Sequence, residues 1–232
     1  MTPGPLILAG GAEFDERMAA ADRAWLAARR IVRPRLGLFP TANTERPDRA
    51  AANGVRHFRR LVTRPEAVMV TTRETTEDGR VLSQVPDLDY AYFAGGDPLH
   101  LAETLAGSRV WEALVRRWRE GMGLGGSSAG AMVMCNSVFV RERWAAGLAL
   151  VPGVVALPHF NRRDAASADR ARREVSARGL VGLGIDESTA LVWTPEGGWR
   201  AAGEGSVHLL SDAGVQRYDD GAAVPGVPTP AA

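Results

Sequence analysis

The chain has 232 residues, a length that fits one α/β domain and allows a substantial core to be buried. Hydrophobic residues make up 45% of it and charged residues 24%, and the formal net charge is +1. A balance this close to neutral gives no electrostatic basis for binding nucleic acid or an anionic membrane surface, so we expect neither as a partner.

The sequence also lacks the marks of secretion, membrane insertion and bound cofactors. Its single cysteine, Cys135, cannot form an internal disulfide, which fits a reducing compartment. The opening residues carry no basic segment that would predict a signal peptide, and no apolar run approaches the roughly 18 residues of a membrane helix. No spacing of Cys, His and carboxylates indicates a metal site, and the phosphate-binding glycine patterns are absent. We therefore expect a cytoplasmic protein without cofactor or metal.

Short apolar runs alternate with segments of helical periodicity in the first part of the chain. The runs predict buried strands at residues 5–11, 35–41, 67–71, 89–94 and 121–126. The segments between them predict helices at residues 13–30, 47–61, 98–120 with a break at Gly107, and 129–135. This alternation is typical of a mostly parallel sheet with helices on both faces.

The pattern changes after residue 137. Two strands, at 154–157 and 181–185, flank an arginine-rich helix at 163–178. Short antiparallel strands with glycine turns are predicted at residues 190–194, 199–202 and 207–210. The sequence therefore predicts a single α/β domain over residues 1–218, followed by a flexible tail at 219–232 that is rich in Pro, Gly and Ala.

Residues 125–131, GGSSAGA, carry the most information about chemistry. They follow an apolar strand and precede a short helix, the setting in which G-x-S-x-G forms a tight bend. Flanking residues must be small there, and the serine hydroxyl is lifted toward the amides at the helix start. Centring the pattern on Ser128 keeps both glycines, Gly126 and Gly130, whereas centring it on Ser127 loses the second. We predict Ser128 as a nucleophile, with a plain glycine-rich turn as the alternative.

A serine hydroxyl needs an adjacent base at neutral pH. The chain offers four histidines: His57, His100, His159 and His208. His57 lies among arginines on a predicted exposed helix, His100 at a helix start and His208 in a late hairpin. His159 directly follows the predicted strand at 154–157, and sites in parallel sheets form at the carboxyl ends of strands. We therefore predict His159 as the base.

A carboxylate is expected to orient the imidazole. Glu142 is the only acidic residue between the serine and the histidine, and it is our prediction for this role. An ordinary surface charge is the other interpretation of Glu142. Asp164 and the Asp186–Glu187 pair, further along the chain, remain open as alternatives.

The segment AGGDP at residues 94–98 ends a predicted strand and starts a helix. Glycines at such a turn let backbone amides approach a ligand closely. We assign the N–H groups of Gly96 and Ala129 as donors to an oxyanion. Asp97 is predicted to cap the following helix and is also available to a ligand. These residues together predict acyl transfer to water through an acyl-enzyme.

Five segments also match a known pattern: LILAGGAE near the start, YFAGGD at 92–97, GGSSAGAMVM at 125–134, LPHF at 157–160 and GLGIDESTALV at 182–192. In this order they resemble the serine peptidase family that holds dipeptidase E (aspartyl dipeptidase) and cyanophycinase. The segments span most of the chain, and five ordered matches are far more specific than the serine motif alone.

The resemblance implies a flavodoxin-like fold similar to the class I glutamine amidotransferases, with serine in place of their cysteine. It implies Ser128 and His159 as the catalytic pair, with Glu or Asp as third member, and hydrolysis of dipeptides or short peptides that carry aspartyl groups. Such substrates call for a cation near the site. Arg163 and Arg170 are the predicted substrate-binding residues, with Arg170 favoured. The expected partner is a small peptide substrate, and a homodimer is left open.

Some positions depart from the family pattern. Pro98 follows Asp97 where cyanophycinase-like sequences tend to carry glutamine, and Asn161 and Ala165 interrupt their arginines after the HF pair. Dipeptidase E-like sequences tend to carry G-G-N where this chain has G-G-D. Asp97 would repel an aspartyl carboxylate or bind a free amino group, and is therefore a third predicted substrate-binding residue.

Three other functions stay open. One is a cyanophycinase-like or isoaspartyl peptidase, another is a small-molecule esterase, and the third is a non-catalytic binding protein on the same scaffold. Esterases of the α/β-hydrolase type usually place the histidine much further from the serine and carry an HGG-type oxyanion loop, and this sequence has neither feature. A non-catalytic protein would leave the serine unactivated.

Overall fold

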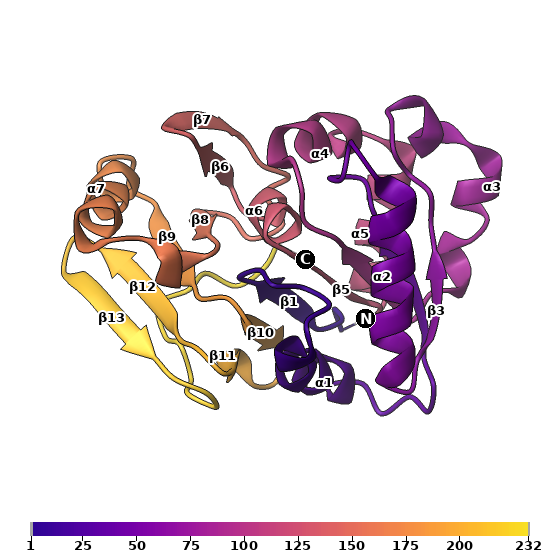
Figure 1. Ribbon diagram of the computed structural model, residues 1–232, viewed down its shortest axis with the longest axis horizontal. Helices are drawn as coiled ribbons and strands as arrows, with labels where there is room; N and C mark the ends of the chain where they lie inside the picture. Colours follow the sequence, from indigo (N-terminus) through magenta and orange to yellow (C-terminus); the bar gives the residue numbers. More distant parts are fainter. Residues whose placement is uncertain (1, 232) are drawn as a thin grey trace.

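A seven-stranded, mostly parallel sheet forms the centre of the protein, as the computed structural model of residues 2–231 describes it (Figure 1). The strand order is β11-β10-β1-β5-β4-β2-β3. The strands are β1 (Leu6–Ala9), β2 (Arg35–Phe39), β3 (Arg64–Ala67), β4 (Tyr90–Phe93), β5 (Gly123–Ser127), β10 (Thr189–Thr194) and β11 (Gly198–Gly203). Strands β10 and β11 run antiparallel to their neighbours, and the other five are parallel.

Helices cover both faces of this sheet because its central strands are apolar on both sides. Leu6 and Leu8 of β1 pack in one core with α4 (Pro98–Leu105), α5 (Arg109–Arg119) and α6 (Ala129–Met134). Ile7 and Ala9 point the opposite way, as strand geometry requires. They pack in a second core with α1 (Ala19–Ala27) and α2 (Pro47–Arg60). The five short helices are η1 (Glu16–Met18), η2 (Glu74–Glu77), α3 (Gly79–Leu82), η3 (Val85–Asp87) and η4 (Phe160–Arg162).

A second, four-stranded sheet lies beside the first, at the left of Figure 1, in the order β13-β12-β9-β8. Its strands are β8 (Val154–Leu157), β9 (Val181–Ile185), β12 (Val207–Ser211) and β13 (Gly214–Tyr218), and α7 (Ala165–Ser176) packs against it. Strands β8 and β9 are parallel neighbours, so their carboxyl ends lie at the same edge. A separate hairpin consists of β6 (Ser137–Val140) and β7 (Arg143–Ala146).

The predicted break at Gly107 is present, since α4 ends at Leu105 and α5 begins after its N-cap Ser108. The strand predicted at 67–71 lies elsewhere, because β3 pairs with β2 over Arg64–Ala67. Val68 and Val70, which suggested that strand, are fully buried in the core just beyond its end. Neither the β6–β7 hairpin nor β13 was predicted.

The predicted tail at 219–232 is described as far as residue 231, and its flexibility stays a prediction. The Val224 N–H donates to the Trp199 carbonyl (2.9 Å), and the Trp199 indole N–H donates to the Pro228 carbonyl (3.0 Å). Val224 is 3% exposed. A segment rich in Pro and Gly has few amides for a regular strand, but it can still pack along β11.

Two absences apply to residues 2–231. No helix there combines the length and hydrophobicity needed to cross a membrane. The same residues contain no group of three or more His, Cys, Asp or Glu side chains arranged to hold a metal ion.

Candidate active site

Ser128 lies at the bend between β5 and α6, with φ 49° and ψ −108°. A non-glycine residue rarely adopts this backbone conformation, and such strain persists where surrounding structure imposes it. The Ser128 N–H donates to the Ala9 carbonyl of β1 (2.9 Å). A Cβ atom on Gly130 would lie 2.5 Å from the Phe93 carbonyl oxygen, and one on Gly126 would lie 2.7 Å from it. The crowding behind this bend therefore accounts for both glycines of the motif.

The two adjacent serines face different surroundings. The Ser128 hydroxyl lies beside His159, with 3.1 Å between Oγ and Nε2. Ser127 is fully buried, and its hydroxyl donates to Glu13 Oε2 (3.0 Å). Of the two serines, Ser128 has its hydroxyl at the imidazole.

His159 lies two residues beyond the end of β8 and adopts a left-handed conformation, with φ 52° and ψ 37°. Its N–H donates to the Gly10 carbonyl (2.7 Å), which ties the histidine to the end of β1. The side chain is 37% exposed, so solvent and a ligand can reach it. The imidazole therefore meets the serine hydroxyl at Nε2 and is still partly open to solvent.

Glu187, not Glu142, is the carboxylate next to the imidazole. Glu187 Oε1 lies 2.7 Å from His159 Nδ1. The Glu142 carboxylate pairs instead with Arg170 (2.7 Å), and these two side chains are 73% and 61% exposed. Asp164, another alternative, caps α7 by accepting from the Ser167 N–H. Glu142 belongs to the β6–β7 hairpin, which was not predicted, and the turn of this hairpin directs it to α7.

The surroundings of Glu187 keep its carboxylate ionised. Burial acts to raise its pKa, because the side chain is 15% exposed. Hydrogen bonds from His159 and Arg162, together with their charges, outweigh burial and hold the pKa of Glu187 below its ordinary value. An ionised Glu187 accepts a hydrogen bond from Nδ1 and so favours the tautomer whose Nε2 can accept a proton.

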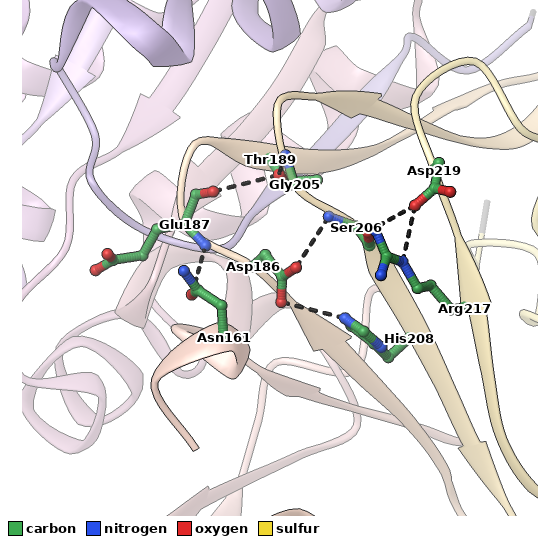
Figure 2. Close-up of polar contacts among 9 residues, drawn as sticks. All are labelled: Asn161, Asp186, Glu187, Thr189, Gly205, Ser206, His208, Arg217 and Asp219. Carbon is green, nitrogen blue, oxygen red and sulfur yellow. Dashed lines mark hydrogen bonds and ion pairs between the residues drawn. The ribbon is translucent and has the colours of Figure 1, made fainter. Parts of the chain in front are cut away.

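A set of polar contacts holds the turn that carries Glu187 (Figure 2). The Glu187 N–H donates to Asn161 Oδ1 (3.1 Å), which links this turn to the segment after His159. Asp186 accepts from the Ser206 N–H (3.0 Å) and lies 3.2 Å from His208 Nε2. The neighbouring strand β12 therefore fixes the residue just before Glu187.

The position of Glu187 follows from a signal that is present in the sequence. Residues 181–185 predict a strand, and Glu187 comes just after its end, as His159 comes just after β8. In the structure β8 and β9 are parallel neighbours in which Leu157 is opposite Gly184. Applying the strand-end argument to both strands, rather than to the histidine alone, would have favoured the Asp186–Glu187 pair over Glu142.

Gly96 and Ala129, the two predicted oxyanion donors, come from two different turns of the larger sheet. Ala129 is the first residue of α6, and Gly96 lies in the turn between β4 and α4. Among residues 2–231 neither N–H has a hydrogen-bond acceptor, so both can serve a ligand. Asp97 caps α4 as predicted, because its side chain accepts from the N–H groups of Leu99 and His100.

Beside Ser128 the surface is hollowed into a cavity of about 430 Å³, which Arg162, Arg163 and Arg170 help to line. A neighbouring cavity of about 460 Å³ is lined by Asp97 and Glu45, and the two share Gly96. The turn at Gly96 therefore borders two hollows that both contain charged side chains, with more arginines in the one beside Ser128.

The three arginines beside the serine differ in their partners. Arg162 donates to Glu187 Oε1 (2.9 Å), and Arg170 is paired with Glu142. Arg163 forms no ion pair within residues 2–231, and its buried Nε meets no acceptor. Burial lowers the pKa of Arg163, a sign that its charge is incompletely hydrated. Of the two predicted substrate-binding arginines, Arg163 is the one without an anionic partner.

A protein-family model matches most of this chain. The model of Peptidase family S51 matches residues 6–198, most of the chain. The chain belongs to peptidase family S51. The matched range includes the serine bend, His159 and Glu187. The family predicted from the five segments is confirmed, and the chain is a serine peptidase.

Several proteins resemble this S51 peptidase. A cyanophycinase of Trichormus variabilis is 27% identical over 226 residues, which cover 90% of this chain and 74% of that one. A cyanophycinase of Synechococcus elongatus is 29% identical over 199 residues, which cover 78% of this chain and 59% of that one.

Two solved structures are also similar. The crystal structure of a peptidase from an acI-B1 actinobacterium has a TM-score of 0.83 and 27% identity, over 96% of this chain and 97% of that one. A putative peptidase E protein of Listeria monocytogenes has a TM-score of 0.65 and 16% identity, over 87% and 99%, and shows the same fold. The predicted fold class of this S51 peptidase is therefore confirmed.

Proposed function

We propose that Ser128, His159 and Glu187 are the catalytic triad of this peptidase and that it cleaves dipeptides or short peptides with an acidic residue. One observation carries the proposal: the imidazole of His159 bridges the Ser128 hydroxyl at 3.1 Å and the Glu187 carboxylate at 2.7 Å. Nucleophile, base and orienting acid are recognised by this geometry rather than by their order in the chain.

The reaction begins when Ser128 Oγ attacks the peptide carbonyl and its proton passes to His159 Nε2. The amides of Gly96 and Ala129 hold the negative oxygen of the tetrahedral intermediate. His159 then protonates the leaving amine, and an acyl-enzyme forms at Ser128. Water activated by His159 hydrolyses the ester, while Glu187 stabilises the imidazolium in both halves of the reaction.

The unpaired guanidinium of Arg163 supports an acidic substrate. Arg163 lines the hollow beside Ser128 without an ion-pair partner, so its charge is free to bind a carboxylate in a partly dehydrated place, where charge-assisted bonds are strong. Arg170 is less suited to this task, because Glu142 already neutralises it. On the other side of Gly96, the Asp97 carboxylate suits a free amino group of the substrate.

A cyanophycinase-like or isoaspartyl specificity is a second candidate. Two of the similar proteins are cyanophycinases, and a β-linked aspartyl residue also presents a carboxylate to Arg163. The two candidates differ in which aspartyl carboxyl group carries the scissile bond. The same triad serves either linkage, so specificity depends on how the hollow orients the substrate.

A substrate panel tests the proposal. We expect turnover of α-Asp-Xaa or β-Asp-Xaa dipeptides, much slower turnover of Asn-Xaa peptides of equal size, and none with Ser128→Ala. Turnover of α- but not β-linked peptides supports the first specificity, and the reverse supports the second. Hydrolysis of short acyl esters without cleavage of any peptide contradicts the proposal and favours an esterase.

We also propose that the peptidase works in a reducing compartment such as the cytoplasm, as a homodimer. Cys135 is the only cysteine, and its thiol is buried. The location is tested by fractionation of cells that produce the protein. Light scattering during gel filtration measures the assembly, and a mass of one chain contradicts the homodimer.

A further inference from the structure

The loop at residues 10–14, between β1 and η1, touches every part of the site although none of its side chains takes part in the proposed chemistry. Its Gly10 carbonyl accepts from the His159 N–H (2.7 Å). Its Gly11 carbonyl accepts from the N–H of Ser188 (3.2 Å), the residue after Glu187. The loop therefore joins the base and the acid to the end of β1.

Glu13 joins the other half of the site to the same loop. Its Oε1 accepts from the Gly95 N–H (2.9 Å), and its Oε2 accepts from the Ser127 hydroxyl (3.0 Å). Gly95 directly precedes the oxyanion donor Gly96, and Ser127 directly precedes the nucleophile Ser128. One carboxylate thus spans the two segments whose separation sets the size of the oxyanion hole.

The backbone around Glu13 is held in an unusual conformation. Ala12 and Phe14, on either side of it, have φ values of 55° and 69°. The Phe14 ring anchors the loop, since its centroid lies 6.3 Å from that of Phe58 on α2 and 6.3 Å from that of Tyr92 on β4. Positive φ at two non-glycine residues costs free energy, and such strain concentrates at functional sites.

Folding stability alone does not explain why position 13 carries a carboxylate. Within residues 2–231, no Arg or His side chain forms an ion pair with Glu13. A half-buried carboxylate without a cation is expensive to dehydrate unless hydrogen bonds replace its water. A Cβ on Gly95 would lie 2.5 Å from Glu13 Oε1, so the carboxylate fits closely against this turn.

We infer that Glu13 is a positioning residue: it fixes the Gly96 amide relative to the Ser128 hydroxyl and thereby sets the geometry of the oxyanion hole. This inference rests on the proposed function. Without the two hydrogen bonds of Glu13, the turn after β4 can move away from the serine bend. Substrate still binds, because Arg163 and the hollow are unchanged, but the Gly96 amide no longer meets the oxyanion in the transition state.

The test compares Glu13→Ala, Glu13→Gln and the matched control Glu16→Ala, an exposed glutamate in the same segment. We expect Glu13→Ala to lower kcat by about 100-fold, the effect of removing one oxyanion donor, with KM changed by less than roughly threefold. Glu13→Gln restores most of kcat, because its amide oxygen accepts from Gly95 and its NH₂ donates to Ser127 Oγ. Glu16→Ala behaves like wild type.

A second readout is the rate at which a fluorophosphonate labels Ser128, which requires the oxyanion hole but no peptide binding. We expect this rate to fall in Glu13→Ala in parallel with kcat. If Glu13→Ala does not fold, Ser127→Ala removes one of the two bonds, and we expect a smaller loss of the same kind.

Provided that the fluorophosphonate labels wild-type protein at Ser128, three results contradict the role of Glu13 without contradicting the proposed function. They are an unchanged kcat in Glu13→Ala, a loss confined to KM, and an equal loss in Glu13→Ala and Glu13→Gln. Wild-type protein that neither labels at Ser128 nor cleaves any peptide contradicts the proposed function itself, and the inference falls with it.

Discussion

The seven-stranded and four-stranded sheets each carry half of the site, and they hold their halves by different means. Ser128 and Gly96 follow the adjacent parallel strands β5 and β4 of the larger sheet. Backbone crowding holds Ser128 there, since its bend has positive φ and no room for a side chain at Gly130. The chain can adopt few other conformations at this bend.

In the four-stranded sheet, hydrogen bonds between side chains and backbone contribute most to holding the residues of the site in place. His159 and Glu187 follow the parallel strands β8 and β9, and Asn161 and Asp186 hold the turn of Glu187. The base is also more open, with 37% of its side chain exposed. The two halves differ in degree: backbone crowding dominates at Ser128, whereas His159, whose N–H is bonded to the Gly10 carbonyl, and Glu187 depend more on polar contacts.

The largest expected effect on kcat comes from Ser128, in the half of the site that the seven-stranded sheet carries. Ser128→Ala is expected to lower kcat on the order of 10⁶-fold, because no acyl-enzyme can form. Ser127→Ala keeps the nucleophile, loses only the hydrogen bond to Glu13, and is expected to retain far more activity. Steady-state kinetics on the best peptide measures both. Equal losses in the two variants would break the distinction between the two serines.

The next largest expected effect comes from Glu187, the acid in the half of the site that the four-stranded sheet carries. Glu187→Gln is expected to lower kcat by about 10⁴-fold, because the imidazolium loses its counter-charge and the favoured tautomer. Glu142→Gln, the matched change at the position first predicted from sequence, is expected to change kcat less than roughly threefold because its partner is the exposed Arg170. Pre-steady-state acylation rates separate this loss from product release. A larger loss in Glu142→Gln contradicts the assignment.

Substitution of Arg163, the proposed substrate-binding residue, is expected to have a smaller effect than substitution of Ser128 or Glu187. Arg163→Gln removes one charge-assisted bond to the substrate, so kcat/KM for aspartyl peptides falls by about 10- to 100-fold. The fall is confined to substrates in which the aspartyl residue carries a free carboxylate beside the scissile bond. Arg170→Gln is the matched control and leaves kcat/KM nearly unchanged. The comparison uses aspartyl and asparaginyl peptides of equal length, and an equal loss on both assigns Arg163 to folding.

Stability should depend on pH through the polar contacts of Glu187. The pKa of Glu187 is lower in the folded protein than its ordinary value of 4.5. Its contribution to stability is therefore complete above pH 4.5 and is lost as the pH falls through the lowered pKa. We expect the difference in Tm between wild type and Glu187→Gln to shrink in this acidic range. A difference that stays constant from neutral to acidic pH contradicts this linkage.

The smallest effect concerns Cys135, just beyond the end of α6, whose start adjoins Ser128. Burial raises the pKa of the Cys135 thiol to about 12, and the thiol is fully enclosed. We expect iodoacetamide to leave the folded protein unmodified and fully active, and to alkylate it completely in denaturant. Intact mass measures the modification. Rapid alkylation of the native protein would show that α6 opens more easily than its packing suggests.

The difference between the two sheets also explains which parts of the site could be predicted from the sequence. Gly126, Ser128 and Gly130 lie within five positions, so a local pattern sufficed to identify the bend. The acid lies 28 residues beyond the base, and its role depends on the parallel pairing of β8 with β9. A search restricted to the segment between serine and histidine could only find Glu142. The composition of the tail likewise does not reveal that Trp199 and Val224 are buried.

The most direct test is mass mapping of the wild-type protein after reaction with a fluorophosphonate. We expect one adduct per chain, on Ser128, with none after denaturation and very slow labelling of His159→Gln. An adduct on Ser127, or no adduct on the folded enzyme, would contradict the activation of Ser128 by His159.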